Sequence, residues 1–176
     1  MERVLQLASQ VGFTCAATLN TAALIVRQEV RDMCAADRCQ SFGRSWSCPP
    51  ACGSLEHCTQ RIAGYSRGVL VQTTGSMEDD FDAVAISETY LSHKKSFETL
   101  ARQVRSIYPN CLPLTAGACT LCRKCTYPER PCRFPGKRLS SMEAYGLLVS
   151  DVCIKSGVQY NHGPRTITYT SCILLA

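Results

Sequence analysis

The residues best able to do chemistry are four cysteines near position 120. Cys119, Cys122 and Cys125 have the spacing C-x2-C-x2-C, and Cys132 follows seven residues later. This spacing is typical of iron–sulfur loops, because thiolates on one short loop can reach different corners of one cluster. Structural zinc sites usually take their ligands as two pairs separated by a longer stretch. The spacing therefore predicts a [4Fe-4S] site, with structural zinc and disulfide bonds as alternatives.

A second group of cysteines precedes these by about eighty residues. Cys34, Cys39 and Cys48 predict the core of a second metal site, with Cys52 as the expected fourth ligand. One alternative is that these thiols are buried and pack as small hydrophobic groups. Another is a cluster held by three cysteines only. Such a cluster has one open iron, to which a substrate can bind directly.

The remaining five cysteines are expected in the hydrophobic core, because their neighbours along the chain or on a helical face are apolar. They are Cys15, Cys58, Cys111, Cys153 and Cys172. His93 is expected to be solvated, since it stands in a charged stretch of a predicted helix. Glu143 is expected first to cap a helix and second to be an acid–base candidate. Neither a phosphate-binding glycine loop nor a Ser-His-Asp signature is present, so no catalytic residue is predicted.

The formal charge of +5 has a local explanation. Six basic residues and a single acid, Glu129, lie between Cys119 and Arg138. Cations near thiolates favour the deprotonated, metal-binding form. A [4Fe-4S]2+ core with four thiolates carries about −2, so two such sites would bring the formal charge to about +1. Nucleic acid is therefore not an expected partner.

Hydrophobic periodicity predicts an α/β fold, with a small mixed β-sheet flanked by helices. The strand, long helix and strand between residues 68 and 116 predict two parallel neighbouring strands. Ser140 and Glu143 form a potential capping box for a short helix. The expected helices cover residues 2–11, 22–33, 55–63, 79–108 and 151–156, with a strand as the alternative for residues 22–33. The expected strands cover residues 13–19, 68–72, 112–116 and 166–175.

A chain of 176 residues is expected to form one α/β domain over residues 1–176. Within it lie an N-terminal cysteine-rich segment (34–58) and a C-terminal cluster loop (119–138). The apolar runs are too short to cross a bilayer, and the N-terminus lacks the pattern of an export signal. Without export, thirteen cysteines are not expected to form a disulfide framework, so a reducing cytoplasm is the predicted location.

Several motifs occur together in a fixed order along the chain. They are Cys34 and Cys39, Phe42-Gly43, Trp46-Ser47-Cys48-Pro49-Pro50, Gly117-Ala118-Cys119-Thr120-Leu121-Cys122 with Cys125, Cys132-Arg133-Phe134-Pro135, and Ser141-Met142-Glu143-Ala144-Tyr145-Gly146. In these the chain resembles the cysteine-rich predicted metal-binding proteins of anaerobes, grouped as domain of unknown function 2284. The resemblance runs from about residue 30 to the C-terminus. It implies metal or iron–sulfur binding and no settled reaction, and the family pattern usually has no counterpart of Cys52 and Cys58.

Together these features predict an iron–sulfur protein that binds one or two [4Fe-4S] clusters and acts in electron transfer or low-potential redox chemistry. One alternative is an iron–sulfur enzyme whose N-terminal cluster exposes an open iron to substrate. The other is a zinc-stapled interaction module. The expected partner is a redox protein or a small-molecule substrate, with no membrane.

Overall fold

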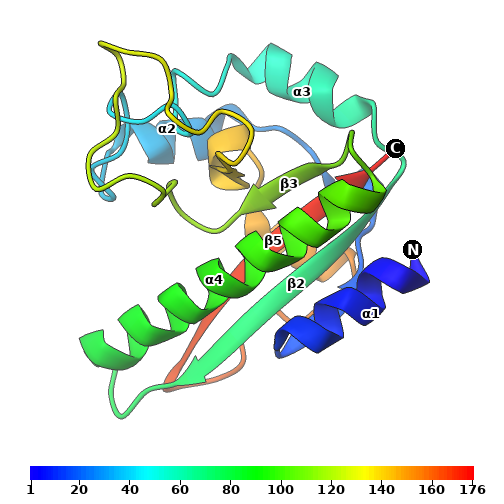
Figure 1. The fold of residues 1–176 in the computed structure, drawn as a ribbon. Coiled ribbons are helices and arrows are strands. Elements are labelled where there is room, and N and C mark those ends of the chain that lie inside the picture. Colours follow the sequence, from blue (N-terminus) through cyan, green and yellow to red (C-terminus); the bar gives the residue numbers. More distant parts are fainter.

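The computed structural model describes residues 1–176 and contains one five-stranded sheet between two layers of helices (Figure 1). Its order is β1-β2-β5-β3-β4, and every pair is antiparallel except β3–β4. This mixed sheet confirms the predicted α/β fold class. The strands are β1 (Cys15–Thr18), β2 (Arg67–Ser76), β3 (Leu112–Thr115), β4 (Ser140–Ser141) and β5 (Thr166–Leu175).

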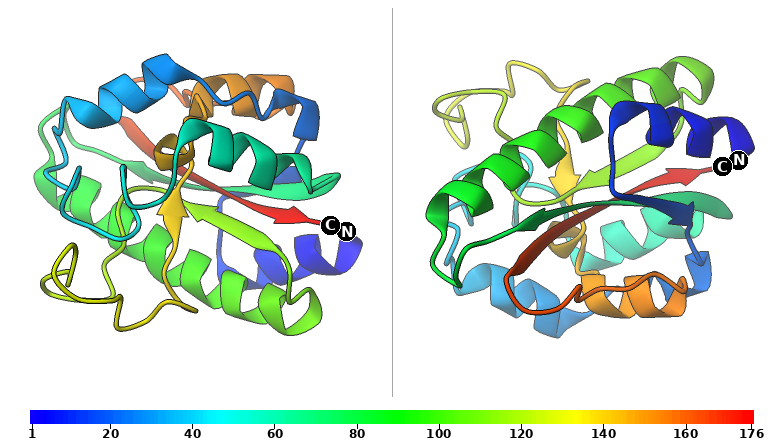
Figure 2. Two further views of the ribbon diagram at one scale, coloured as in Figure 1. Left: turned by 90° about the horizontal axis from the view of Figure 1, so that it is seen from above. Right: turned by 90° about the horizontal axis from the view of Figure 1, so that it is seen from below.

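The helices cover both faces of the sheet. Figure 2 shows α1 and α4 on one face and α2, α3 and α5 on the other. The predicted helix over residues 22–33 is wrong as a single element, because the chain there forms a short 3-10 turn and then a separate helix. The elements are α1 (Glu2–Val11), η1 (Thr21–Ala23), α2 (Gln28–Ala35), α3 (Leu55–Ala63), α4 (Ala83–Ile107), η2 (Glu143–Tyr145) and α5 (Val149–Lys155). None of the helices is both long and apolar enough to cross a membrane.

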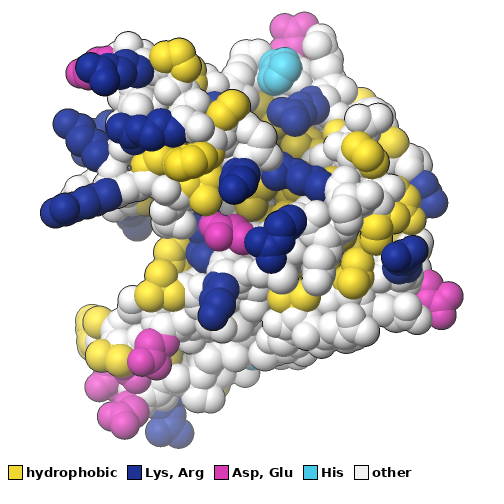
Figure 3. All heavy atoms as spheres, viewed as in Figure 1, with side chains coloured by type: hydrophobic (Ala, Val, Ile, Leu, Met, Phe, Trp, Pro, Cys, Tyr) yellow, Lys and Arg dark blue, Asp and Glu magenta, His cyan; other side chains and the backbone are white.

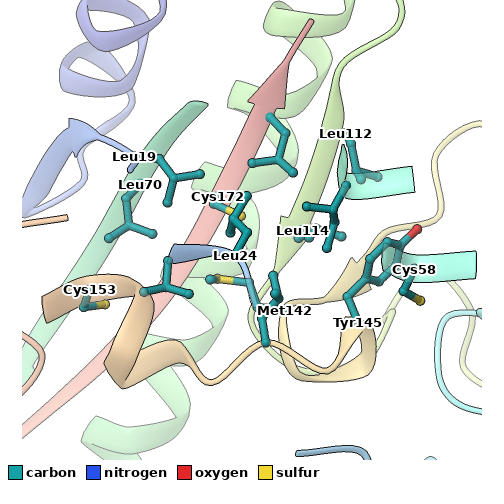
Figure 4. Packing of buried hydrophobic residues seen from close by; sticks show 14 of the residues in the cluster. Leu19, Leu24, Cys58, Leu70, Leu112, Leu114, Met142, Tyr145, Cys153 and Cys172 are labelled. Carbon is teal, nitrogen blue, oxygen red and sulfur yellow. The ribbon is translucent and has the colours of Figure 1, made fainter. Parts of the chain in front are cut away.

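The central strands β2 and β5 are buried on both faces, so the hydrophobic core has two halves. Val69 and Ile173 pack toward α1 and α4, whereas Leu70 and Cys172 point to the opposite face, as alternation along a strand requires. Figure 4 shows this second half, where cysteines lie among leucines. Four of the five predicted core cysteines are buried and Cys15 is partly buried, which confirms that prediction.

The prediction that β2 and β3 are parallel neighbours is wrong. The two strands run in the same direction, but β5 lies between them and pairs antiparallel with both, so that Cys172 is opposite Leu70 on one side and Leu114 on the other. The strand that separates them comes from the C-terminus. Its ladder with β2 extends over ten residue pairs, which the shorter β3 could not match.

The middle of α4 is buried, which contradicts the expectation that His93 is solvated. His93 is fully buried, with Nδ1 lying 2.9 Å from Thr73 Oγ1 and Nε2 lying 2.7 Å from Ser171 Oγ. Burial, and then the neighbouring Lys94, lower the pKa of His93 to about 3, so its ring is neutral. The helical pattern could not show that β2 and β5 supply hydroxyl groups to this ring.

The two cysteine-rich segments lie side by side at the end of the molecule opposite the termini (Figures 1 and 2). One segment connects α2 to α3, and the other connects β3 to β4. The capping box predicted at Ser140 is wrong, because Ser140 belongs to β4. Instead, Ser141 Oγ accepts a hydrogen bond from the Ala144 N–H at 3.0 Å. This tight turn places Glu143 beside the first cysteine segment.

Candidate metal centre

The connection between β3 and β4 brings all four of its cysteines to one cavity, which we call the loop cavity. Its volume is about 20 Å3, and the lining includes Cys119, Cys122, Cys125 and Cys132. No three or more His, Cys, Asp or Glu side chains lie close enough together to hold a single metal ion. The sulfur atoms therefore surround a shared space without meeting at one point. Four soft thiolate donors of this kind suit an iron–sulfur cluster or zinc.

Contacts with the first cysteine segment hold the loop in place. The Trp46 indole N–H donates a hydrogen bond to the Arg130 carbonyl at 3.0 Å, and the Trp46 ring meets the Tyr127 ring edge-on at 4.9 Å. Within the loop, the Thr126 hydroxyl donates to the Pro131 carbonyl at 2.9 Å. Trp46 also lines the loop cavity, so the Trp46 ring covers part of the wall beside the thiols.

The surroundings of Cys125 favour its thiolate form. Burial would raise its pKa, but hydrogen bonds from the backbone N–H groups of Trp46 and Tyr127 and from the Ser45 hydroxyl outweigh burial and lower it. Hydrogen bonds donated to sulfur stabilise its negative charge. The same donors are the groups by which a protein orients cluster ligands and tunes their potential.

The first cysteine segment forms a second and larger cavity, which we call the Glu143 cavity. Its volume is about 300 Å3, and Cys34, Cys39 and Cys48 line it together with Glu143 and Arg38. Cys34 comes from α2, Cys48 from the buried stretch before Pro49, and Glu143 from η2. Apolar side chains from α2 and the following turn complete its wall. Three thiols and one carboxyl group thus face one space from distant parts of the chain.

Burial raises the pKa of three groups of the Glu143 cavity, Cys34, Cys48 and Glu143, and so makes them harder to ionise. It raises the pKa of Cys34 to about 11, with the Glu143 charge as the next cause, and it also raises the pKa of Glu143 itself. Metal binding requires deprotonated ligands and releases their protons. A metal entering this cavity must therefore displace protons from thiols that hold them tightly.

Cys52 does not line either cavity. Its thiol donates a hydrogen bond to the Ala144 carbonyl at 3.4 Å, and burial raises its pKa to about 11 although Arg31 acts in the opposite direction. Arg31 also donates to the sulfur of Cys58, at 3.5 Å. The role of Cys52 as a fourth ligand stays a prediction.

A buried pair of serines connects the two cavities, and the sequence analysis did not identify them. Ser47 Oγ accepts a hydrogen bond from the Cys119 N–H at 3.1 Å and lies 3.6 Å from the Cys48 sulfur. Ser45 Oγ lies 3.0 Å from Ser47 Oγ, and Ser45 also lines the loop cavity. Serines carry no ligand pattern, so only their position on either side of Trp46, just before Cys48, could have marked them.

Lys94 is the second group missed by sequence analysis. Its side chain is buried in α4, and the ammonium group donates to the carbonyls of Ala118 at 2.9 Å and Ala116 at 3.5 Å. Burial lowers the pKa of Lys94, whereas the nearby thiols of Cys119 and Cys48 act to raise it. Lys94 thus places a cation beside ligand candidates of both cavities.

Comparison with known proteins identifies a family. The family model described as predicted metal-binding protein (DUF2284) matches residues 17–175. No curated protein and no solved structure matches the chain. The matched range extends from β1 to the end of β5 and includes both cavities. The chain therefore belongs to the DUF2284 family of predicted metal-binding proteins.

Proposed function

We propose that this metal-binding protein carries two iron–sulfur clusters and moves electrons at low potential. One [4Fe-4S] cluster would occupy the loop cavity, and a second cluster would occupy the Glu143 cavity. The observation that carries this proposal is the convergence of all four loop cysteines, spaced C-x2-C-x2-C, on one cavity. The hydrogen bonds aimed at Cys125 add support, because they stabilise a thiolate ligand.

The separation of the thiols favours a cluster over a single zinc ion. Four sulfurs bound to one zinc at about 2.3 Å would lie about 3.8 Å from each other. No three ligand side chains in this structure come together in that way. The cysteines of a cluster bind different irons and stand further apart. At about 20 Å3 the loop cavity must still widen to admit a cluster.

The Glu143 cavity favours a second candidate function, that of an iron–sulfur enzyme. Three thiols face this cavity, so one corner of a bound cubane would lack a protein sulfur. A small substrate could then occupy the same cavity, whose volume is about 300 Å3. Glu143 would lie beside it as a carboxyl group whose pKa burial raises, which favours its holding a proton next to the substrate.

The proposal also includes a reducing cytoplasm, since all thirteen cysteines are free thiols in the structure. Thiolates bound to iron and thiols packed in the core both require reduced cysteine.

Metal analysis of protein purified without oxygen tests the main proposal. We expect about eight irons and about eight sulfides per chain, with a broad absorption shoulder near about 400 nm. Zinc in place of iron, without sulfide, would instead establish the zinc-stapled interaction module.

Two matched variants decide between the functions proposed for the Glu143 cavity. Cys48→Ser should remove its iron, whereas Cys52→Ser should leave iron content and spectrum unchanged if three cysteines are the ligands. Cyanide added to the reduced Cys52→Ser protein should then alter its electron paramagnetic resonance signal, because an open iron can bind it. Loss of iron from Cys52→Ser would instead favour ligation by four cysteines and simple electron transfer.

A further inference from the structure

Six basic side chains belong to the loop between β3 and β4, whose cysteines line the loop cavity. Five of them are exposed and Arg138 is partly buried. Neither of the two ion pairs in the structure involves any of these residues. Figure 3 shows lysine and arginine side chains gathered over this region, at the upper left. The six are Arg123, Lys124, Arg130, Arg133, Lys137 and Arg138.

A bound cluster would not neutralise this charge. Six basic residues against the single acid Glu129 give residues 119–138 a formal charge of +5. A [4Fe-4S]2+ core with four thiolates reduces this charge by about two, so a net charge of about +3 remains. The side chains that carry it are mostly directed into solvent. Charge balance within the metal site therefore accounts for only part of the basic surface.

Two of the loop thiols are close to the outside as well as to the loop cavity. Cys122 lines the loop cavity and also a surface hollow of about 710 Å3 that it shares with Arg123 and Lys124. Cys132 lines the loop cavity and a second hollow of about 440 Å3, beside Arg130 and Arg138. A molecule seated on either hollow would touch basic side chains and lie next to a candidate ligand.

We propose that this basic surface is the docking site of a small, acidic electron-carrier protein. This inference rests on the proposed iron–sulfur function and names the partner of the loop cluster. The reduced carrier would lose one electron, and a cluster held by the four loop cysteines would accept it. Complementary charge accelerates such encounters and orients the partners, and salt weakens the effect.

The surface suits a protein better than a nucleic acid. Proteins that hold single strands combine basic grooves with aromatic rings on which the bases stack. Here the Trp46 and Tyr127 rings pack against each other, and Phe134, 41% exposed, is the remaining aromatic residue of the loop. The surface therefore offers charge without a row of stacking rings.

Rapid-mixing kinetics test the docking site on the full-length, cluster-loaded protein. The probe is a reduced plant-type [2Fe-2S] ferredoxin, which is a small acidic carrier. We expect its second-order rate of cluster reduction to fall at least tenfold between about 20 mM and 300 mM salt. The double variant Arg123→Glu/Lys124→Glu should be slower by about tenfold to hundredfold at low salt and should lose most of this salt dependence.

Two controls separate docking from other effects. The double variant Arg3→Glu/Lys155→Glu makes the same change in net charge on α1 and α5, and it should react at close to the wild-type rate. Photoreduced 5-deazariboflavin, a small uncharged reductant, should reduce the wild type and the two double variants at equal rates. Equal slowing of both double variants by ferredoxin, or no slowing of either, would overturn the docking site.

A failure of the proposed iron–sulfur function would give a different result from a failure of the docking site alone. Protein that contains no reducible cluster would overturn both the proposed function and the docking site. Normal reduction by deazariboflavin with charge-independent reduction by ferredoxin would overturn the docking site alone. Submicromolar binding of a single-stranded oligonucleotide, abolished by Arg123→Glu/Lys124→Glu, would reassign the surface to nucleic acid.

Discussion

The loop cavity and the Glu143 cavity are neighbours, yet they are constructed differently. The loop cavity takes four thiols from one short connection and is narrow, at about 20 Å3. The Glu143 cavity takes three thiols from α2 and the segment after it, adds a carboxyl group from η2, and encloses about 300 Å3. The number of thiols and the free volume separate a site that shields a metal from one that leaves it accessible. This difference supports electron delivery at the first site and chemistry at the second.

Substitution of one loop cysteine should separate the two sites most clearly. In Cys122→Ala we expect the iron content to fall from about eight to about four per chain, because the loop cluster would lose one of its four ligands. The spectrum of the cluster in the Glu143 cavity should remain. Iron and sulfide analysis under anaerobic conditions measures the loss, with Cys15→Ser as the control. Full retention of iron would refute the assignment of the loop cavity.

Removal of Ser47 should disturb both cavities at once. In Ser47→Ala the Cys119 N–H loses its buried acceptor and the Cys48 sulfur loses a hydroxyl neighbour. A buried donor left without a partner destabilises the fold by about 1–3 kcal/mol. Anaerobic urea unfolding measures this change, and the exposed Ser76→Ala is the control. An unchanged free energy of unfolding would mean that the two sites are independent.

Replacement of Lys94 should test whether the two sites share an electrostatic environment. Lys94→Met removes a cation that acts on both Cys48 and Cys119, so both clusters should become harder to reduce. A unit charge about 8 Å away contributes about 2 kcal/mol at an effective dielectric constant of about 20, which is about 90 mV for one electron. Redox titration monitored by paramagnetic resonance measures the shift, and the exposed Lys95→Met is the control. A fall in one potential only would locate the influence of Lys94 at one cavity.

His93 provides a reference outside both cavities. Its pKa is about 3 when folded and about 6.5 when unfolded, so the unfolded chain binds more protons between these values. The contribution of neutral His93 to the free energy of unfolding is therefore fully present above about pH 6.5. This contribution is lost as the pH falls through this range, by about 1 kcal/mol between pH 6.5 and 5.5. Between these two pH values we expect the free energy of unfolding of His93→Gln to fall by about 1 kcal/mol less than that of the wild type. Urea unfolding at both pH values measures the difference, and His57→Gln should behave as wild type.

Elements with strong local signals could be predicted from sequence. Residues 2–11 have a helical period with Gly12 directly after them, and the structure has α1 over Glu2–Val11 with Gly12 at a φ of 96°. Ser54 directly precedes the helix predicted over residues 55–63, and its side chain accepts a hydrogen bond from the His57 N–H. Strand β5 covers Thr166–Leu175 as predicted. In each case neighbouring residues contain all the information required.

The sequence alone also indicated the loop cavity, because its four thiols lie on one connection and their spacing limits how far apart they can be. It could not reveal the order of the strands, the burial of His93 and Lys94, or the position of Glu143 among three thiols. Those features depend on contacts between segments that are distant along the chain. Strand β5 enters the centre of the sheet, the hydroxyls of β2 and β5 make burial of His93 possible, and η2 brings a carboxyl group to three thiols. Folding alone brings these groups together, because no local pattern links them.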